Sequence, residues 1–388
     1  MHKIVALITP KVLQWARNNV AIPIHIAAKR AGVSEDSVSR WELGTTKPSV
    51  RQARLLANLY RVPFAAFYLS EPPSYRIRVP KDYRRLAGTS GREVSSAILI
   101  DLQEALERRS VVLELFEASG TAIPVFDKSV SLNDDPEEVG SALRTTLGVS
   151  LEEQVSWRDS RAGFNSWRAH IEGKGVLVFQ AADVPIKEMR AYSIAEFPYP
   201  VIVVNRKDFP QARTFSLLHE LVHLLLKSAG LCDLSTRVER PPEDQRLEVF
   251  CNAAAAACLM PANAVKQHPI VAHRDLGEAW ADIEIKSLAH YFSVSREALL
   301  RRLLTFGLTD SQFYEQKREQ YRREFEATPK RKGFPPPAQD RLSLLGRPFV
   351  RLVLDSLDRG IVTTSDASDY LGIRLKHLPS LAASLEMD

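Results

Sequence analysis

One segment of the chain, residues 215–226, constrains the fold more than any other. It reads Phe-Ser-Leu-Leu-His-Glu-Leu-Val-His-Leu-Leu-Leu, so apolar side chains surround two histidines and a glutamate. His219 and His223 are four residues apart, which on an α-helix places both imidazoles on one face. The leucines and the valine around them must be covered by neighbouring elements. The segment therefore predicts a helix that runs through a core and directs two imidazoles toward one point.

Two imidazoles on one helical face are a potential ligand pair for a metal ion. Zn²⁺ suits them, because it accepts imidazole nitrogen ligands and has no redox chemistry. Glu220 follows the first histidine directly and is placed to take a proton from a water on the metal, whose pKa falls to about 7 in catalytic zinc sites. A histidine pair on an amphipathic helix can also be purely structural. The leucine-rich helical context favours the metal interpretation, with Glu220 as the catalytic residue.

A catalytic zinc needs a third protein ligand, and the stretch from residue 248 to 261 offers one. Glu248 and Asn252 are four residues apart, and the alanine run Ala253–Ala257 that follows is a strong helix former with small side chains. We assign Glu248 as the third ligand. Asn252 is expected behind the ligands, where it can accept the outer N–H of a ligating imidazole. The alternative for Glu248 is a solvated carboxylate at the start of a helix.

These stretches also carry a family resemblance. The strand-like Pro-Val-Ile-Val-Val-Asn at 200–205, the histidine segment at 212–223 and the stretch from 248 to Leu-Met-Pro at 261 resemble the ImmA/IrrE metallo-endopeptidases. Those enzymes pair a strand ending in Asn with a zinc helix and a Glu-x-x-Ala-Asn helix that closes in Leu-Met-Pro. Cys251 stands where Ala is usual, and an Ala-rich run stands where an aromatic is often found; neither change touches a ligand position. By motif match, the two histidine ligands, the ligand glutamate and the catalytic glutamate fall on His219, His223, Glu248 and Glu220.

The first 85 residues have a different character, because they hold 15 Lys and Arg against 5 Asp and Glu. The whole chain carries a net charge of +5, so the remaining residues are mildly acidic, at −5. A basic module joined to an acidic body indicates a domain that faces a polyanion. A solvated face rich in lysine and arginine is the alternative.

Within this basic region, residues 26–48 resemble the XRE-type helix-turn-helix. Gly32 ends one helix, since a residue without Cβ permits the tight turn, and Ser34 caps a second helix. In that fold the second helix enters the major groove of DNA. The side chains expected at base edges are Ser37 and Arg40, and those expected near phosphates are Lys29, Arg30, Lys47 and Arg51.

Two acidic residues at the start of the second helix argue against simple DNA binding. Glu35 and Asp36 suit the positive end of the helix dipole, but they would repel nearby phosphates. A cytosine amino group could donate to one of them, so they do not exclude binding. A protein-docking role for the same module therefore remains the alternative to sequence-specific DNA binding.

Composition excludes several classes of protein. The chain has 388 residues and is 45% hydrophobic and 26% charged, which is ordinary for a globular protein with real cores. No apolar run approaches the roughly 18 residues of a membrane span, and the amino terminus lacks the pattern of a secretory signal. Three cysteines without metal-type spacing argue against a disulfide scaffold. We therefore expect a cytoplasmic protein with no membrane partner.

The predicted fold is α+β and predominantly helical. Proline-rich and glycine-rich breaks divide the chain into an N-terminal five-helix helix-turn-helix module, a central zincin-like peptidase domain with a small sheet, and a C-terminal helical region. The best strand candidates are residues 176–179 and 201–204. The expected boundaries are 1–70 for the helix-turn-helix, 71–91 for a linker, 92–310 for the peptidase domain, 311–340 for a basic, proline-rich linker and 341–388 for a small helical module.

The residues and the resemblance together indicate a DNA-binding, regulatory zinc endopeptidase that cleaves a transcriptional repressor or an antitoxin. The expected partners are double-stranded DNA and that protein substrate, and a homodimer is left open. The competing interpretation is a helix-turn-helix transcriptional regulator, or an antitoxin-like protein, whose peptidase-like domain acts only as a sensor or docking platform.

Overall fold

The computed structural model describes residues 4–73, 94–227, 231–232, 242–274, 279–327 and 335–386. Most of the linker expected at 71–91, and residues 328–334 of the linker expected at 311–340, lie outside these ranges. The chain divides into two compact units. The first contains residues up to 85, 89–108 and 183–185, and the second contains the rest, so the division falls within a single long helix, α5 (Ser96–Ser119).

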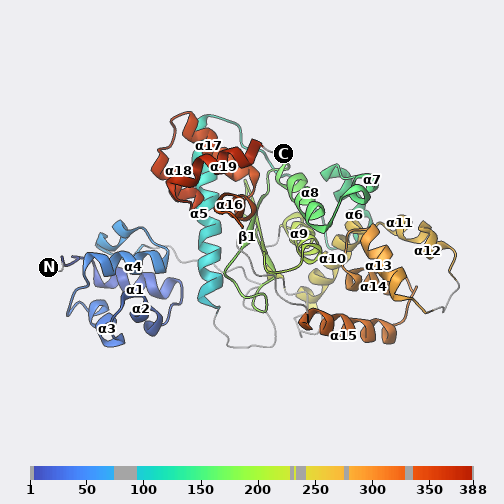
Figure 1. Cartoon of the computed structure of the whole chain (residues 1–388), viewed down its shortest axis with the longest axis horizontal. Coiled ribbons are helices and arrows are strands. Elements are labelled where there is room, and N and C mark those ends of the chain that lie inside the picture. The colour runs from blue at the N-terminus through green and yellow to red at the C-terminus, as the bar shows by residue number, and fades with distance from the viewer. Residues whose placement is uncertain are drawn as a thin grey trace. The chain divides into compact units, whose positions relative to one another are not determined.

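The first unit is the helical module at the amino terminus (Figure 1). The unit consists of α1 (Pro10–Asn19), α2 (Ile24–Ala31), α3 (Glu35–Glu42), α4 (Val50–Tyr60), a 3₁₀ helix η1 (Phe64–Tyr68) and the start of α5. Gly32 ends α2 at a φ of +68°, and the Ser34 side chain accepts a hydrogen bond from the Ser37 amide at the start of α3. Trp41 is buried in the core of this unit. The turn and cap that the sequence predicted are therefore formed, with a 3₁₀ helix as the fifth helix.

The second unit is built on a four-stranded sheet in the order β1-β3-β2-β4. Strand β1 (Leu177–Ala181) runs parallel to β3 (Val201–Asn205), and β2 (Ala191–Ile194) pairs antiparallel with both β3 and the short β4 (Leu231–Cys232). Every residue of β1, β2 and β3 is buried, which explains why the two strands that the sequence predicted read as continuous apolar runs.

Helices cover this sheet and form the main core of the unit (Figure 1). Between α5 and the sheet, the chain forms α6 (Pro136–Leu147), α7 (Leu151–Ser156) and α8 (Ser160–Glu172). Helices α9 (Pro210–Leu225) and α10 (Pro242–Leu259) follow β3. Helix α9 packs across β2 and β3, and α8 and α10 pack against α9. The segment with the two histidines thus lies inside the core, as its sequence predicted.

A further group of helices follows α10. It comprises α11 (Ala262–Gln267), α12 (Pro269–Ala272), α13 (Asp282–Tyr291), α14 (Arg296–Thr305) and α15 (Ser311–Ala327). Residues 311–327 were expected in a linker, but they form a helix. Tyr314 and Tyr321, seven residues apart, are buried in the core of the unit. The many charged residues on the other faces of α15 gave the segment its linker-like composition.

The last described residues form a cluster of helices that packs on the sheet. These are α16 (Pro337–Leu345), α17 (Arg347–Asp358), α18 (Thr364–Leu371), the 3₁₀ helix η3 (Leu375–His377) and α19 (Leu378–Glu386). Helix α16 contacts β1, and the rings of Phe179 and Phe349 meet edge to face at 5.7 Å. The cluster starts at Pro337, the first residue of α16, and shares a compact unit with the sheet.

The predicted fold class, α+β and mostly helical, is confirmed by these elements. Among the described residues, no helix combines the length and the apolar character that crossing a bilayer requires.

Candidate metal centre and nucleic-acid interface

Helix α9 carries the histidines and is held at its start by Asn205. This residue ends β3, is fully buried, and donates its side-chain N–H to the Met189 carbonyl at 2.8 Å. Its side-chain oxygen accepts the Lys207 amide at 3.0 Å. The hydrogen bond that Asn205 donates and the one that it accepts together fix the turn from β3 into α9. This turn sets the position of the helix relative to the sheet.

Helix α10 carries Glu248 and packs closely against both α9 and α6. The contact with α6 depends on Gly140, because a Cβ at this position would lie 2.6 Å from the Ala257 side chain and 2.6 Å from the Cys258 amide nitrogen. The small side chains of the alanine run and Gly140 together allow the backbones of α10 and α6 to approach closely.

A buried polar network that sequence reasoning missed holds the carboxyl-terminal end of α10. Arg144 donates to the Cys258 carbonyl at 2.8 Å and to the Gln154 side chain at 2.5 Å. Gln154 donates to the Leu259 carbonyl at 3.0 Å, and Arg302 donates to the Met260 carbonyl at 2.9 Å. These three side chains satisfy the carbonyls that a helix end leaves unpaired. No local pattern could reveal them, because the partners lie 42 to 114 residues apart.

The structure brings His219, His223 and Glu248 together, with one potential ligand atom from each within 4.8 Å of the others. The two Nε2 atoms are 3.0 Å apart, and the Glu248 carboxylate oxygens lie 3.5 Å from Nε2 of His219 and 3.4 Å from Nε2 of His223. Ligands at zinc distances in a tetrahedron are separated by about 3.3–3.6 Å. The donor types and the spacing of this group therefore fit a tetrahedral metal ion.

Burial and charge at this site favour an ionised Glu248. Burial raises the pKa of Glu248, but hydrogen bonds and charge interactions with His219 and His223 outweigh this effect, and the net pKa lies well below its ordinary value. A carboxylate is the form that coordinates metal.

The other two residues predicted for the site differ in their surroundings. Glu220 is completely buried on α9, between the two histidines in sequence. Asn252 is half-buried on α10, and within the described residues it forms no hydrogen bond with either imidazole. The contact expected of Asn252 is thus not made, although the residue shares a helix with Glu248.

The helix-turn-helix residues lie on the surface of the first unit. The side chains expected near phosphates, Lys29, Arg30, Lys47 and Arg51, are all exposed. Ser37 is half-buried, and its hydroxyl lies 2.9 Å from that of Ser34. The basic side chains are therefore available to a polyanion.

Arg40, the expected base-reading residue, is exposed and paired with Asp36 one helical turn earlier. The guanidinium lies 2.7 Å from the carboxylate. Because both side chains are more than half exposed, the pair is weakly held and can be exchanged for a nucleic-acid contact. Asp36, at the acidic start of α3, therefore competes directly with DNA for the Arg40 guanidinium.

Comparison with known proteins finds a family match in each part of the chain. Residues 172–304 match the peptidase family model described as IrrE N-terminal-like domain, and residues 15–67 match the helix-turn-helix family model. The first match includes His219, Glu220, His223 and Glu248, and the second includes helix α3.

A curated relative is similar to the chain over a shorter stretch. The chain is 39% identical over 67 residues to the radiation response metalloprotease IrrE of Deinococcus deserti. This stretch is 17% of the chain and 24% of the relative, so the chain spans about a quarter of the length of that protein.

Proposed function

We propose that the chain is a DNA-binding regulatory zinc metallo-endopeptidase of the cytoplasm, because residues 15–67 match the helix-turn-helix family model and residues 172–304 match the IrrE-like peptidase family model. The observation that carries the proposal is the convergence of His219, His223 and Glu248. Their ligand atoms come from two packed helices and lie at the spacing of a tetrahedral metal site.

In this proposal His219, His223 and Glu248 hold Zn²⁺. The bound ion would supply a Lewis acid for the scissile carbonyl and a lowered pKa for a water molecule. Glu220 takes the proton from the attacking water at its carboxylate and later delivers it to the leaving amine nitrogen. The complete burial of Glu220 keeps its carboxylate out of bulk water, which strengthens its electrostatic interactions.

The proposed substrate is a transcriptional repressor or an antitoxin, as the ImmA/IrrE resemblance implies. The helix-turn-helix would bring the peptidase to DNA on which such a protein is bound. The exposed basic residues of the first unit support binding to the phosphate backbone.

The test compares cells that express the wild-type chain with cells that express Glu220→Gln, which keeps the size of the side chain but loses the proton acceptor. We expect peptide termini from one or few regulatory proteins, detected by mass spectrometry, in the wild type only. Glu138→Gln, an exposed carboxylate on α6, is the matched control and should behave as wild type.

Identical termini in wild type and Glu220→Gln would contradict the proposed mechanism. No cleavage by the wild type of any protein, together with normal DNA binding, would favour the regulator whose peptidase-like domain is a sensor or docking platform.

A further inference from the structure

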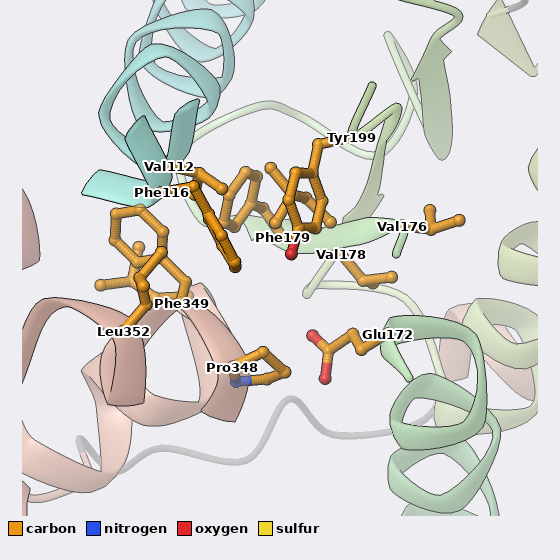
Figure 2. A pocket seen from close by; sticks show the side chains of 12 residues that line it. Val112, Phe116, Glu172, Val176, Val178, Phe179, Tyr199, Pro348, Phe349 and Leu352 are labelled. Carbon is orange, nitrogen blue, oxygen red and sulfur yellow. The ribbon is translucent and has the colours of Figure 1, made fainter. Parts of the chain in front are cut away.

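A pocket of about 90 Å³ lies in the second unit, apart from the metal-centre residues. Its walls come from the second half of α5, the end of α8, strand β1, the turn before β3 and helices α16 and α17 (Figure 2). Because α17 belongs to the C-terminal cluster, the pocket lies where that cluster meets the sheet. It is not explained by the proposed peptidase chemistry.

The walls of the pocket are rich in aromatic rings. Phe116 and Tyr199 contact each other with ring centroids 5.3 Å apart, and Phe179 and Phe349 form an edge-to-face pair at 5.7 Å. Figure 2 shows these rings around the open space. Aromatic faces carry partial negative charge and attract cations.

Two polar groups interrupt the apolar lining. The Glu172 carboxylate and the Tyr199 hydroxyl both point into the space in Figure 2. Tyr199 adopts a φ of +59°, which is unfavourable for a residue with a side chain, and Arg109 donates to its carbonyl at 3.0 Å. Burial raises the pKa of Tyr199 to about 12, so the hydroxyl stays neutral and can accept or donate a hydrogen bond.

Among the described residues that line the pocket, Glu172 is the only acidic one, and its charge is compensated in part. Arg168 donates through Nε to Oε1 of Glu172 at 2.8 Å, while its remaining N–H groups reach the carbonyls of Val178 and Ser343. Within the described residues Oε2 of Glu172 has no hydrogen bond, although the side chain is only 7% exposed. Burial raises the pKa of Glu172, and Arg168 does not fully offset this effect. A second cationic donor at Oε2 would stabilise the carboxylate.

We propose that this pocket binds a small organic ammonium ion, with the charged nitrogen between Oε2 of Glu172 and the hydroxyl of Tyr199. The aromatic walls contact the alkyl groups and contribute cation–π attraction. An anion would meet Glu172 and the negative ring faces, so the lining excludes it. The volume of about 90 Å³ limits the ligand to a compact group of a few carbon atoms.

Glu172, at the polar end of the pocket, is linked through hydrogen bonds to α9, the helix that carries the histidines. The Ser343 carbonyl accepts hydrogen bonds from both Arg168 and Gln180, and the Gln180 side chain accepts one from Arg213 in the first turns of α9. A ligand at Glu172 therefore lies at one end of a continuous hydrogen-bonded path to α9. Binding itself does not depend on peptidase activity and is tested without it.

The test is an NMR titration of the full chain with labelled Val and Leu methyl groups, using tert-butylammonium as the probe. The neutral isostere tert-butanol has nearly the same shape and is the reference ligand. We expect saturable shifts at the pocket methyls of Val112, Val176 and Leu352, and an affinity for tert-butanol at least about tenfold lower.

Glu172→Gln should lower the affinity for tert-butylammonium about tenfold, while Glu152→Gln, an exposed carboxylate on α7, should leave it unchanged. Leu352→Trp places a large ring at the half-buried edge of the pocket and should abolish binding while keeping Glu172. This variant and the isostere comparison decide the question even if Glu172→Gln fails to fold. Equal affinity for tert-butanol, unchanged binding in Leu352→Trp, or shifts confined to other methyls would overturn the proposal.

Discussion

The Nε2 atoms of His219 and His223 lie 3.0 Å apart, and the carboxylate of Glu248 lies within 3.5 Å of both. Nitrogen and carboxylate lone pairs that point to one position repel one another unless a proton or a cation lies between them. All three residues are buried, so water cannot screen this repulsion. A metal ion bound by all three side chains removes this repulsion.

Removing one histidine should therefore remove the metal. Purified wild-type protein should contain about one zinc per chain, and His219→Ala or His223→Ala should contain almost none. Glu248→Ala should hold zinc much more weakly, because two nitrogen ligands remain. The measurement is elemental analysis after dialysis, with His290→Ala, an exposed histidine on α13, as the control. Full zinc in His223→Ala would show that the ligand assignment is wrong.

Gly140→Ala should destabilise the second unit by about 1–3 kcal/mol, since the added methyl group must push α6 away from α10. The Cβ would lie 2.6 Å from the Cys258 amide nitrogen and 2.8 Å from the Ala254 carbonyl, and backbone cannot move as a side-chain tip can. Chemical denaturation measures the change. Ser141→Ala, exposed on the same helix, should change stability by less than about 0.5 kcal/mol. An equal effect of the two substitutions would contradict the close packing.

Cys258 should resist alkylation in the folded protein. Its side chain is completely buried, and burial raises the pKa of the thiol to about 12. Because the thiolate is the reactive form, almost none is present at neutral or mildly alkaline pH. Mass spectrometry after iodoacetamide treatment at pH 8 should find Cys258 unmodified in native protein and modified after denaturation. Modification of the native protein at Cys258 would mean that the end of α10 opens readily.

The sequence predicted the parts of this protein whose signal is local. The spacing of His219 and His223 fixes their common face in any helix, and Ser34 caps α3 through a bond to a residue only three positions away. Continuous apolar runs identified β1 and β3 because both are buried on two faces.

Features that depend on distant partners could not be predicted in this way. Strand β2 is only four residues long, and β4 has two, so neither carries a period-two pattern. Arg144 and Arg302 are ordinary surface-type residues in sequence, and only the fold buries them against the end of α10. The aromatic pocket likewise draws its lining from residues 112 to 352.

Arg40→Ala tests the DNA-binding surface. The guanidinium can bond two guanine acceptors at once, so its loss should cost about 1–3 kcal/mol on the correct site and relax sequence preference there. Lys29→Ala should instead weaken binding to all sequences alike. It should also reduce the slope of log affinity against log salt concentration by about one. Fluorescence anisotropy with the promoter upstream of the gene, between about 50 and 200 mM salt, separates the two effects.

Asp36→Asn tests the acidic start of α3 on the same surface. The Asp36 carboxylate lies 2.7 Å from the Arg40 guanidinium and must give up this ion pair when Arg40 turns to a base. Removing the charge frees Arg40 and also removes repulsion from phosphates, so affinity for duplex DNA should rise and its salt dependence should steepen. Glu35 lies in the same turn and, among the described residues, forms no ion pair with Arg40, so Glu35→Gln separates phosphate repulsion from release of Arg40. If neither the wild type nor Asp36→Asn binds duplex at about 50 mM salt, the module is a protein-docking domain.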